Sequence, residues 1–156
     1  MDTDRRWMKK ALREAERAFD QQEVPVGALV VRNGSIVGRG HNMVETLSDP
    51  SAHAEMIALT AACDTLGTRH LTDCTMYVTL EPCPMCAGAL VQARLKRLVF
   101  GAFDEKAGAC STLYNIVQDE RLNHQIDVVS GLESEQSAGL LRDFFRQRRQ
   151  KRASGQ

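Results

Sequence analysis

The sequence predicts an α/β fold with three layers, in which a mixed five-stranded sheet lies between helices on both faces. Segments with helical spacing of apolar residues alternate along the chain with short apolar or β-branched runs, as expected for such a sheet. The composition, 43% hydrophobic and 26% charged, is that of an ordinary globular protein. The length of 156 residues fits one domain, 1–156, with no repeat or linker.

The N-terminal part predicts a helix followed by a β-hairpin. Apolar residues recur at helical spacing over about 4–20. Residues 28–31 and 35–37 predict two strands, and Asn33-Gly34 between them is a strong hairpin turn signal.

A polar loop and a helix follow the hairpin. The loop covers 42–51, and the helix covers 52–66. Asp49 or Ser51 could cap the start of this helix, and the sequence does not decide between them. Gly67 is a suitable residue to end it.

A second strand–helix unit spans the middle of the chain. The run 75–80 is rich in β-branched and aromatic residues and predicts a strand. Pro82 ends that strand, and Pro84 suits the first turn of a helix over 84–93.

The C-terminal third predicts the remaining elements. A strand over 97–100 precedes a loop rich in Gly and Ala at 101–111 and a short helix at 113–117. A last strand at 126–129 leads into a final helix at 133–150, and the tail after residue 150 is expected to be frayed.

Two of the strand-to-helix corners carry side chains that bind metals. One holds His53 and Glu55, and the other holds Cys83 and Cys86 in a Pro-Cys-x-x-Cys segment. The pattern H-x-E…P-C-x-x-C is typical of zinc deaminases that act on nucleobases. We therefore predict a zinc site with His53, Cys83 and Cys86 as ligands, and the fourth position free for water as in catalytic sites.

The spacing suits this chemistry. Cys83 and Cys86, in a turn that opens a helix, can converge on one ion, and the helix N-terminus favours the thiolate. In the first turn of its helix, Glu55 can point beside the metal and serve as general acid and base, passing protons to the base and to the leaving amine. The two corners must lie side by side, and adjacent parallel strands would place them so.

A structural zinc or a redox cysteine pair are the alternatives. A structural site would need a fourth ligand, for which Cys110 is the only candidate, although we expect Cys110 to be a small buried or lining residue. Five cysteines and no apolar signal segment argue against a disulfide framework. The expected compartment is the cytoplasm, and no apolar run approaches the roughly 20 residues of a membrane span.

Charge is balanced overall but uneven along the chain. From Leu140 onward there are six basic residues against Asp143 alone. This cluster could be a footprint for phosphates. The alternative is a solvated helix end whose cations suit the helix dipole.

The chain resembles the bacterial tRNA-specific adenosine deaminases, which have a cytidine-deaminase-like fold, over nearly its full length. The matching stretches are 23–28, 53–56, 77–89, 99–102, 123–124 and 143–146. The resemblance implies zinc-dependent conversion of the wobble adenosine in a tRNA anticodon to inosine, with release of ammonia, by a homodimer that binds the anticodon stem-loop.

The resemblance also implies roles for individual residues. Asn42 would hydrogen-bond the flipped-out base, since an amide offers both a donor and an acceptor. Asp104 would lie near the nucleotide. Phe144, Phe145 and Arg146 would grip the anticodon loop, because RNA loops are typically bound by stacking on aromatic and Arg side chains. At least one of the two phenylalanines is expected in the core.

Two other functions remain open. A deaminase of free guanine, cytosine or their nucleosides would share the zinc motif, but predicts a closed pocket and no need for a basic helix. A non-catalytic RNA-binding subunit could use zinc only for folding. Glu55 argues against that second function, because a carboxylate beside the metal has no role in a purely structural site.

Overall fold

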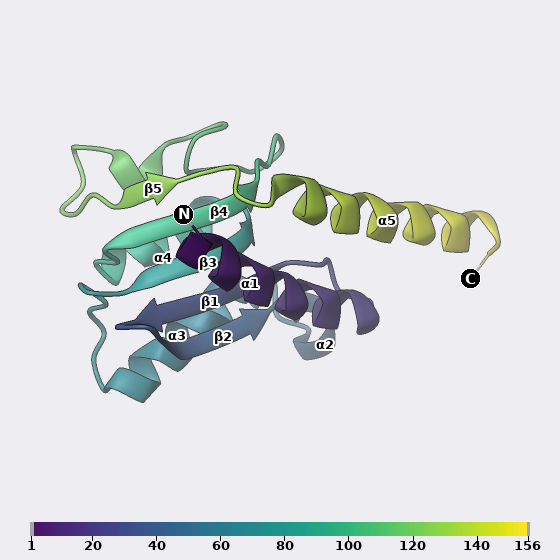
Figure 1. Cartoon of the computed structure of the whole chain (residues 1–156). Helices are drawn as coiled ribbons and strands as arrows, with labels where there is room; N and C mark the ends of the chain where they lie inside the picture. The colour runs from purple at the N-terminus through teal and green to yellow at the C-terminus, as the bar shows by residue number, and fades with distance from the viewer. Residues whose placement is uncertain (1, 156) are drawn as a thin grey trace.

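The computed structural model describes residues 2–155 and has three layers (Figure 1). The strands are β1 (Gly27–Arg32), β2 (Ser35–His41), β3 (Thr75–Leu80), β4 (Arg97–Ala102) and β5 (Asp127–Val129). The helices are α1 (Asp2–Asp20), α2 (Val44–Leu47), α3 (Ala54–Leu66), α4 (Pro84–Gln92) and α5 (Ser134–Ala153), with a 3-10 turn η1 (Ile116–Gln118). The predicted mixed five-stranded sheet between helical layers is confirmed.

The strand order in the sheet is β2-β1-β3-β4-β5. β1 is antiparallel to both β2 and β3, whereas β3, β4 and β5 are parallel. The expectation that the two metal-binding corners follow adjacent parallel strands is therefore wrong, because β1 lies between β2 and β3. Since β2 and β3 both oppose β1, they run in the same direction, and the chain leaves both at one edge of the sheet.

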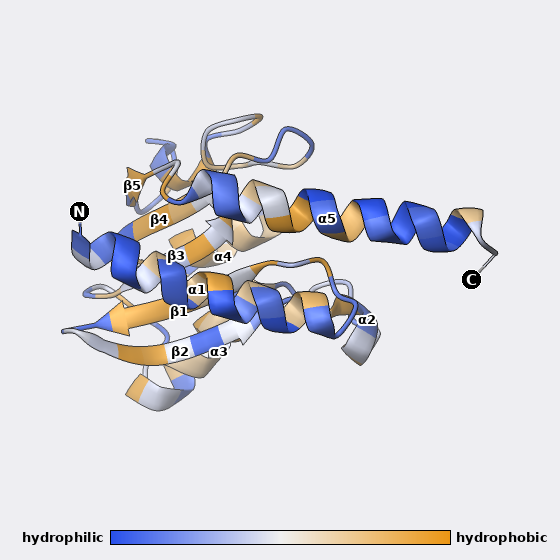
Figure 2. Cartoon of the chain, turned by 45° about the vertical axis from the view of Figure 1, so that its right-hand side comes forward, coloured by the Kyte–Doolittle hydropathy of each residue, from blue (hydrophilic) through white to orange (hydrophobic). Residues whose placement is uncertain are grey.

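The two faces of the sheet are covered by different helices (Figures 1 and 2). α3 and α4 cover one face, where Ala58 and Leu90 pack with Val30, Val78 and Phe100. α1 covers the other face, and α5 contacts β4 on that side. The second core holds mainly apolar side chains of α1 and of the facing strand positions, namely Trp7, Met8, Ala11, Leu29, Val31, Tyr77, Val99 and Leu132.

Two glycines set how closely α3 lies on β2. A Cβ at Gly38 would stand 2.3 Å from the carbonyl oxygen of Ala58, and a Cβ at Gly40 would stand 2.7 Å from that of Ala54. These are contacts with helix backbone, which cannot move aside as a flexible side chain can. Glycine at both positions thus lets α3 pack directly on the strand, and this packing fixes where α3 begins.

Several predicted boundaries differ from the structure. α3 begins at Ala54 with no side-chain cap, because Asp49 instead accepts hydrogen bonds from the N–H and the hydroxyl of Ser51 within the preceding loop. That loop contains the helix α2, which was not predicted. The predicted helix at 113–117 is replaced by η1.

The C-terminal end of α5 lies beyond its predicted position. The helix continues to Ala153, three residues beyond the predicted end at residue 150. Its last turns extend past the sheet, and Figure 2 shows that most of this part is hydrophilic. Among residues 2–155, no helix combines the length and apolar character needed to cross a membrane.

Candidate active site

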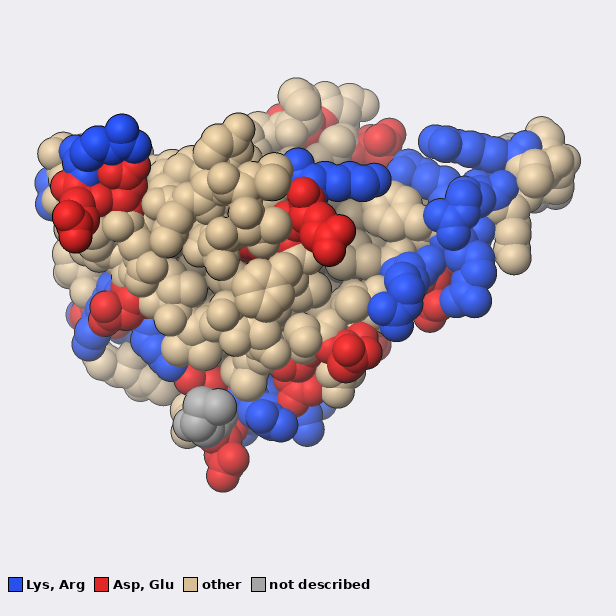
Figure 3. Space-filling model, turned by 90° about the horizontal axis from the view of Figure 1, so that it is seen from above, with Lys and Arg blue, Asp and Glu red and all other residues tan. Residues whose placement is uncertain are grey.

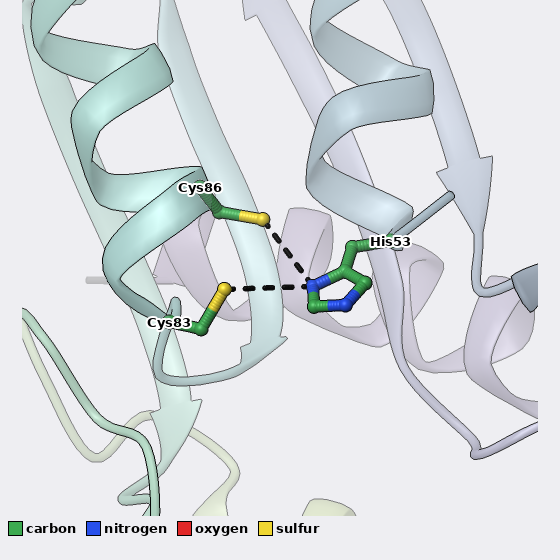
Figure 4. A group of neighbouring side chains, drawn as sticks. All are labelled: His53, Cys83 and Cys86. Atoms are coloured by element: carbon green, nitrogen blue, oxygen red, sulfur yellow. Dashed lines mark hydrogen bonds between the residues drawn. The ribbon is translucent and has the colours of Figure 1, made fainter. Parts of the chain in front are cut away.

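Three potential metal ligands converge where α3 and α4 begin (Figure 4). His53 immediately precedes α3, Cys83 immediately precedes α4, and Cys86 lies in the first turn of α4. The Nδ1 atom of His53 is 3.5 Å from the Sγ atom of Cys83 and 3.5 Å from that of Cys86. The ligating atoms all lie within 4.8 Å of one another, so one ion could contact all three.

The local backbone explains this convergence. His53 and Cys83 both have extended conformations, with φ and ψ of −73° and 152° for His53 and −76° and 173° for Cys83. Each side chain therefore leaves the chain just before the helix starts. Pro84 occupies the first helical position, where its fixed φ favours the helix and its missing N–H is not needed.

Hydrogen bonding within the group favours one thiolate. The Cys86 thiol donates to Cys83, and this bond, helped by His53, lowers the pKa of Cys83 to about 4. The same bond and burial raise the pKa of Cys86. The hydrogen bond with Cys83 raises the pKa of His53. Cys83 is thus a thiolate at neutral pH, which is the form that binds metals.

Glu55 lies beside this group in the first turn of α3. Its side chain is buried, at 5% exposed, and lines the same cavity as His53 and Cys83. Burial raises the pKa of Glu55 to about 7, and the positive charge of His53 acts in the opposite direction. Within residues 2–155, the metal-binding group consists of His53, Cys83 and Cys86 and does not include Glu55 or Cys110.

A cavity of about 260 Å³ opens in front of the group. Its walls come from the turn before β1, the start of α2, the ends of β3 and β4, and α5. The lining residues are Glu23, Val24, Val26, Asn42, Val44, Glu45, His53, Ala54, Glu55, Leu80, Glu81, Cys83, Asp104, Ala107 and Arg148. The cavity thus contains both residues predicted to contact the base and nucleotide, Asn42 and Asp104.

The two predicted contacts differ in how they are held. Asn42 is buried, at 7% exposed, and its N–H donates to the carbonyl oxygen of Val26. The Asp104 carboxylate accepts hydrogen bonds from the N–H groups of Lys106 and Ala107, at 3.0 Å and 3.2 Å. Part of its hydrogen-bonding capacity therefore serves to shape its own loop.

The residues predicted on α5 separate into buried and exposed ones. Phe144 is only 7% exposed and packs edge-on against Phe19 at 5.9 Å, so its predicted contact with RNA is not supported. Phe145 is 38% exposed, and Arg146 is exposed and paired with Asp143. The expectation that at least one phenylalanine packs in the core is confirmed by Phe144.

A basic groove of about 700 Å³ runs along α5 beside the cavity. Its lining residues are Lys106, Leu141, Arg142, Phe145, Arg146, Arg148, Arg149 and Arg152. Figure 3 shows Lys and Arg side chains gathered along this end of the molecule. Arg148 lines both the groove and the cavity, and its guanidinium stacks over the Phe144 ring at 5.2 Å.

Sequence reasoning from the catalytic motif missed three cavity residues, Glu23, Glu81 and Arg148. Both glutamates are buried, at 0% and 1% exposed. Each stands directly beside a proline-containing turn at an end of an apolar strand, Glu23 before Val24-Pro25 and Glu81 before Pro82. An acidic residue beside a proline-containing turn at the end of an apolar strand is a sequence pattern that could have indicated these two positions. Arg148 follows Phe144 by one helical turn, but only the structure shows that it reaches the cavity.

The fold and this site define a deaminase, and residues 2–149 match the MafB19-like deaminase family. The chain is 51% identical to the tRNA-specific adenosine deaminase of Bacillus subtilis over 152 residues, which are 97% of this chain and 94% of that protein. It belongs to the tRNA-specific adenosine deaminase family.

Solved structures agree with this assignment. A structure from work on A-to-I editing by tRNA:A34 deaminases at the wobble position matches with a TM-score of 0.83 and 42% identity, over 86% of this chain and 97% of that one. A guanine deaminase from Nitrosomonas europaea has a TM-score of 0.77 and 25% identity, over 88% of this chain and 81% of that one. The fold is therefore shared by deaminases of different substrates, so the fold alone does not identify the substrate.

The lowered pKa of Cys83 has a direct chemical consequence. In protein freed of metal with a chelator, iodoacetamide at pH 6 is expected to alkylate Cys83 first, because pH 6 is above its pKa of about 4. Burial raises the pKa of Cys63 and, to about 11, that of Cys74, so both remain neutral thiols at this pH. Peptide mass spectrometry over time measures the order. Faster labelling of Cys63 or Cys74 would contradict the assignment, and added metal should protect Cys83.

Proposed function

We propose that this protein deaminates the wobble adenosine of a tRNA anticodon to inosine by hydrolysis, with release of ammonia. The observation that carries the proposal is the cavity in which Glu55 stands beside His53 and Cys83, bordered by a basic groove in a chain 51% identical to a tRNA-specific adenosine deaminase. A catalytic pocket next to a cationic surface suits a nucleotide that belongs to a larger RNA.

Zinc is the proposed metal. A tetrahedral zinc ion with nitrogen at about 2.0–2.1 Å and sulfur at about 2.3 Å holds those atoms about 3.6 Å apart. The two distances between His53 Nδ1 and the cysteine sulfurs, 3.5 Å each, fit that geometry. One imidazole and two thiolates are also ligands that zinc prefers, and three protein ligands leave a position for water.

The residues of the chain then have distinct roles. His53, Cys83 and Cys86 would hold zinc, which supplies Lewis-acid activation of a water molecule. The Glu55 carboxylate takes a proton from the attacking water and delivers it to a ring nitrogen of the base. The water oxygen bonds to the carbon that carries the exocyclic amine. Glu55 then takes the remaining proton of the added hydroxyl and passes it to that amine, the C–N bond breaks, and ammonia leaves. A single carboxylate can do both steps because it acts as base first and as acid afterwards.

Recognition of the substrate uses the cavity wall and α5. Asn42 would hydrogen-bond the purine edge, since its amide offers a donor and an acceptor. Asp104 would lie near the bound nucleotide, where it also lines the cavity. Phe145 and Arg146 would contact the anticodon loop by stacking and by charge, and both line the basic groove. Phe144 would support this surface from below.

The assembly and location follow the family resemblance. We propose a homodimer of single-domain chains in the cytoplasm. Exposed apolar side chains offer a surface for a partner, including Leu47 at 54%, Leu113 at 51% and Tyr114 at 58% exposed.

The substrate assignment is tested by comparing RNA with free bases. Purified protein is incubated with an anticodon stem-loop that carries wobble adenosine and, separately, with free adenosine, cytosine and guanine. We expect inosine in the RNA, measured by nucleoside mass spectrometry, and no turnover of the free compounds. Turnover of a free base with no inosine in the RNA would support the alternative function and contradict the proposal.

The role of Glu55 is tested by Glu55→Gln, which keeps the size of the side chain but cannot carry a proton. We expect deamination to fall by about 10²–10⁴-fold, because general acid–base catalysis contributes that much. Zinc content, measured by mass spectrometry of the metal, should stay at one ion per chain. Full activity in this variant, or loss of its zinc, would show that the role is assigned wrongly.

The RNA-binding role of α5 is tested by the double variant Arg146→Gln and Arg149→Gln. Removing two phosphate contacts should weaken stem-loop binding and lower the slope of log affinity against log salt by about 1–2. Fluorescence anisotropy at several salt concentrations measures this slope. The matched control is Lys9→Gln with Arg13→Gln on α1, which removes the same charge elsewhere. If both double variants lower the salt slope equally, the effect comes from net charge alone, and a specific RNA-binding role for the groove is contradicted.

A further inference from the structure

The most deeply buried glutamates of the described chain are Glu23 and Glu81, and both line the candidate active site without touching the metal ligand group. A buried carboxylate is costly unless hydrogen bonds satisfy it. Both carboxylates accept hydrogen bonds from segments that border the cavity. Neither side chain has a role in the chemistry described above.

Glu23 acts as a cap for α2 from a distant part of the chain. Its carboxylate accepts hydrogen bonds from the N–H of Glu45 at 3.1 Å and the N–H of Thr46 at 2.6 Å. It also accepts one from the Thr46 hydroxyl at 2.6 Å. These N–H groups belong to the first turn of a helix, where no partner exists within the helix itself. Met43, at the capping position, supplies no side-chain bond.

α2 has little else to hold it. None of its four residues is buried, and Leu47 is 54% exposed, so apolar packing contributes little to its position. The chain just before it is anchored, because the N–H of Asn42 donates to Val26 and the N–H of Met43 donates to Ala52. Glu23 therefore holds the segment that continues directly from Asn42 and forms one wall of the cavity.

Glu81 does the same for the loop after β4. Its carboxylate accepts hydrogen bonds from the N–H groups of Asp104 at 3.1 Å, Cys110 at 3.1 Å and Thr112 at 2.9 Å. The Thr112 hydroxyl also donates to it, at 2.5 Å. The loop passes so close that a Cβ at Gly108 would lie 2.4 Å from a carboxylate oxygen of Glu81. The Glu81 carboxylate thus forms hydrogen bonds with both ends of the loop that carries Asp104.

We propose that Glu23 and Glu81 are positioning residues, each of which fixes one wall of the substrate cavity. Glu23 orders α2, which continues directly from Asn42, and Glu81 orders the loop that carries Asp104. The effect on substrate rests on the proposed function, whereas the ordering of the two loops does not. Because misplacing a substrate by about 1 Å can cost about 10²-fold in rate, loss of either carboxylate should reduce catalysis.

The test uses Glu23→Gln and Glu81→Gln in the full-length, zinc-loaded protein. Glutamine keeps the size but turns an NH2 group toward backbone N–H donors. The matched control is Glu14→Gln, a buried glutamate at 4% exposed whose ionic partners, Arg17 and His41, lie outside the two loops. Glu23→Asp and Glu81→Asp, which keep the charge with a shorter reach, serve where a glutamine variant fails to fold or loses zinc.

Amide hydrogen exchange tests the ordering directly. Glu23→Gln should speed exchange at Glu45 and Thr46 by at least about 10-fold while Asp104, Cys110 and Thr112 stay protected, and Glu81→Gln should do the reverse. Glu14→Gln should change neither set. Exchange that rises evenly over the whole chain would indicate a general folding role and overturn the proposal, as would unchanged protection of both loops.

Kinetics on the anticodon stem-loop test the link to catalysis. We expect kcat/KM per folded, zinc-loaded molecule to fall by about 10–100-fold in both glutamine variants and to stay at the wild-type value in Glu14→Gln. The aspartate variants should lie between. Unchanged kcat/KM with mobile loops would overturn the positioning role. If wild-type protein fails to deaminate the RNA, the proposed function fails, while the exchange result still decides whether the two carboxylates order the loops.

Discussion

The site depends on one spatial constraint: the N-termini of helices α3 and α4 must lie next to each other. His53 precedes one helix, and Cys83 precedes the other, yet their ligating atoms lie 3.5 Å apart. An antiparallel strand separates the two strands that lead toward these helices, so the sheet alone does not bring the corners together. The close packing of α3 on the glycines of β2 completes the arrangement. A side chain at Gly38 or Gly40 would displace α3 and, with it, the histidine.

Around this point, charge and burial are arranged in two different ways. The thiol and imidazole groups share hydrogen bonds among themselves, which leaves Cys83 as a thiolate. Burial acts to raise the pKa of Glu23 and of Glu81. Hydrogen bonds from a threonine hydroxyl, Thr46 or Thr112, and from backbone N–H groups nevertheless hold each pKa below its ordinary value. The cavity therefore combines groups poised to exchange a metal or a proton with groups that stay charged and fixed.

Sequence patterns predicted the local features well and the tertiary ones poorly. Strand and helix periodicity located the sheet and its covering helices, and the spacing of His53, Cys83 and Cys86 predicted a cluster that the structure brings together. α2 escaped prediction because a helix of four residues has no periodicity, and this one is capped by a glutamate over twenty residues away in sequence. The sequence predicted that Phe144 or Phe145 is buried but not which one, since the burial of Phe144 depends on Phe19 in another helix.

The construction of α5 separates two kinds of residue along one helix. Its first half packs on the body through Ser137 and Phe144, which are buried, whereas its last turns extend past the sheet and carry exposed cations. Substitutions of the exposed residues in this outer part therefore remove no buried side chain. Such an arrangement lets the charge of the outer turns change, residue by residue, while the candidate metal site and the fold remain as they are.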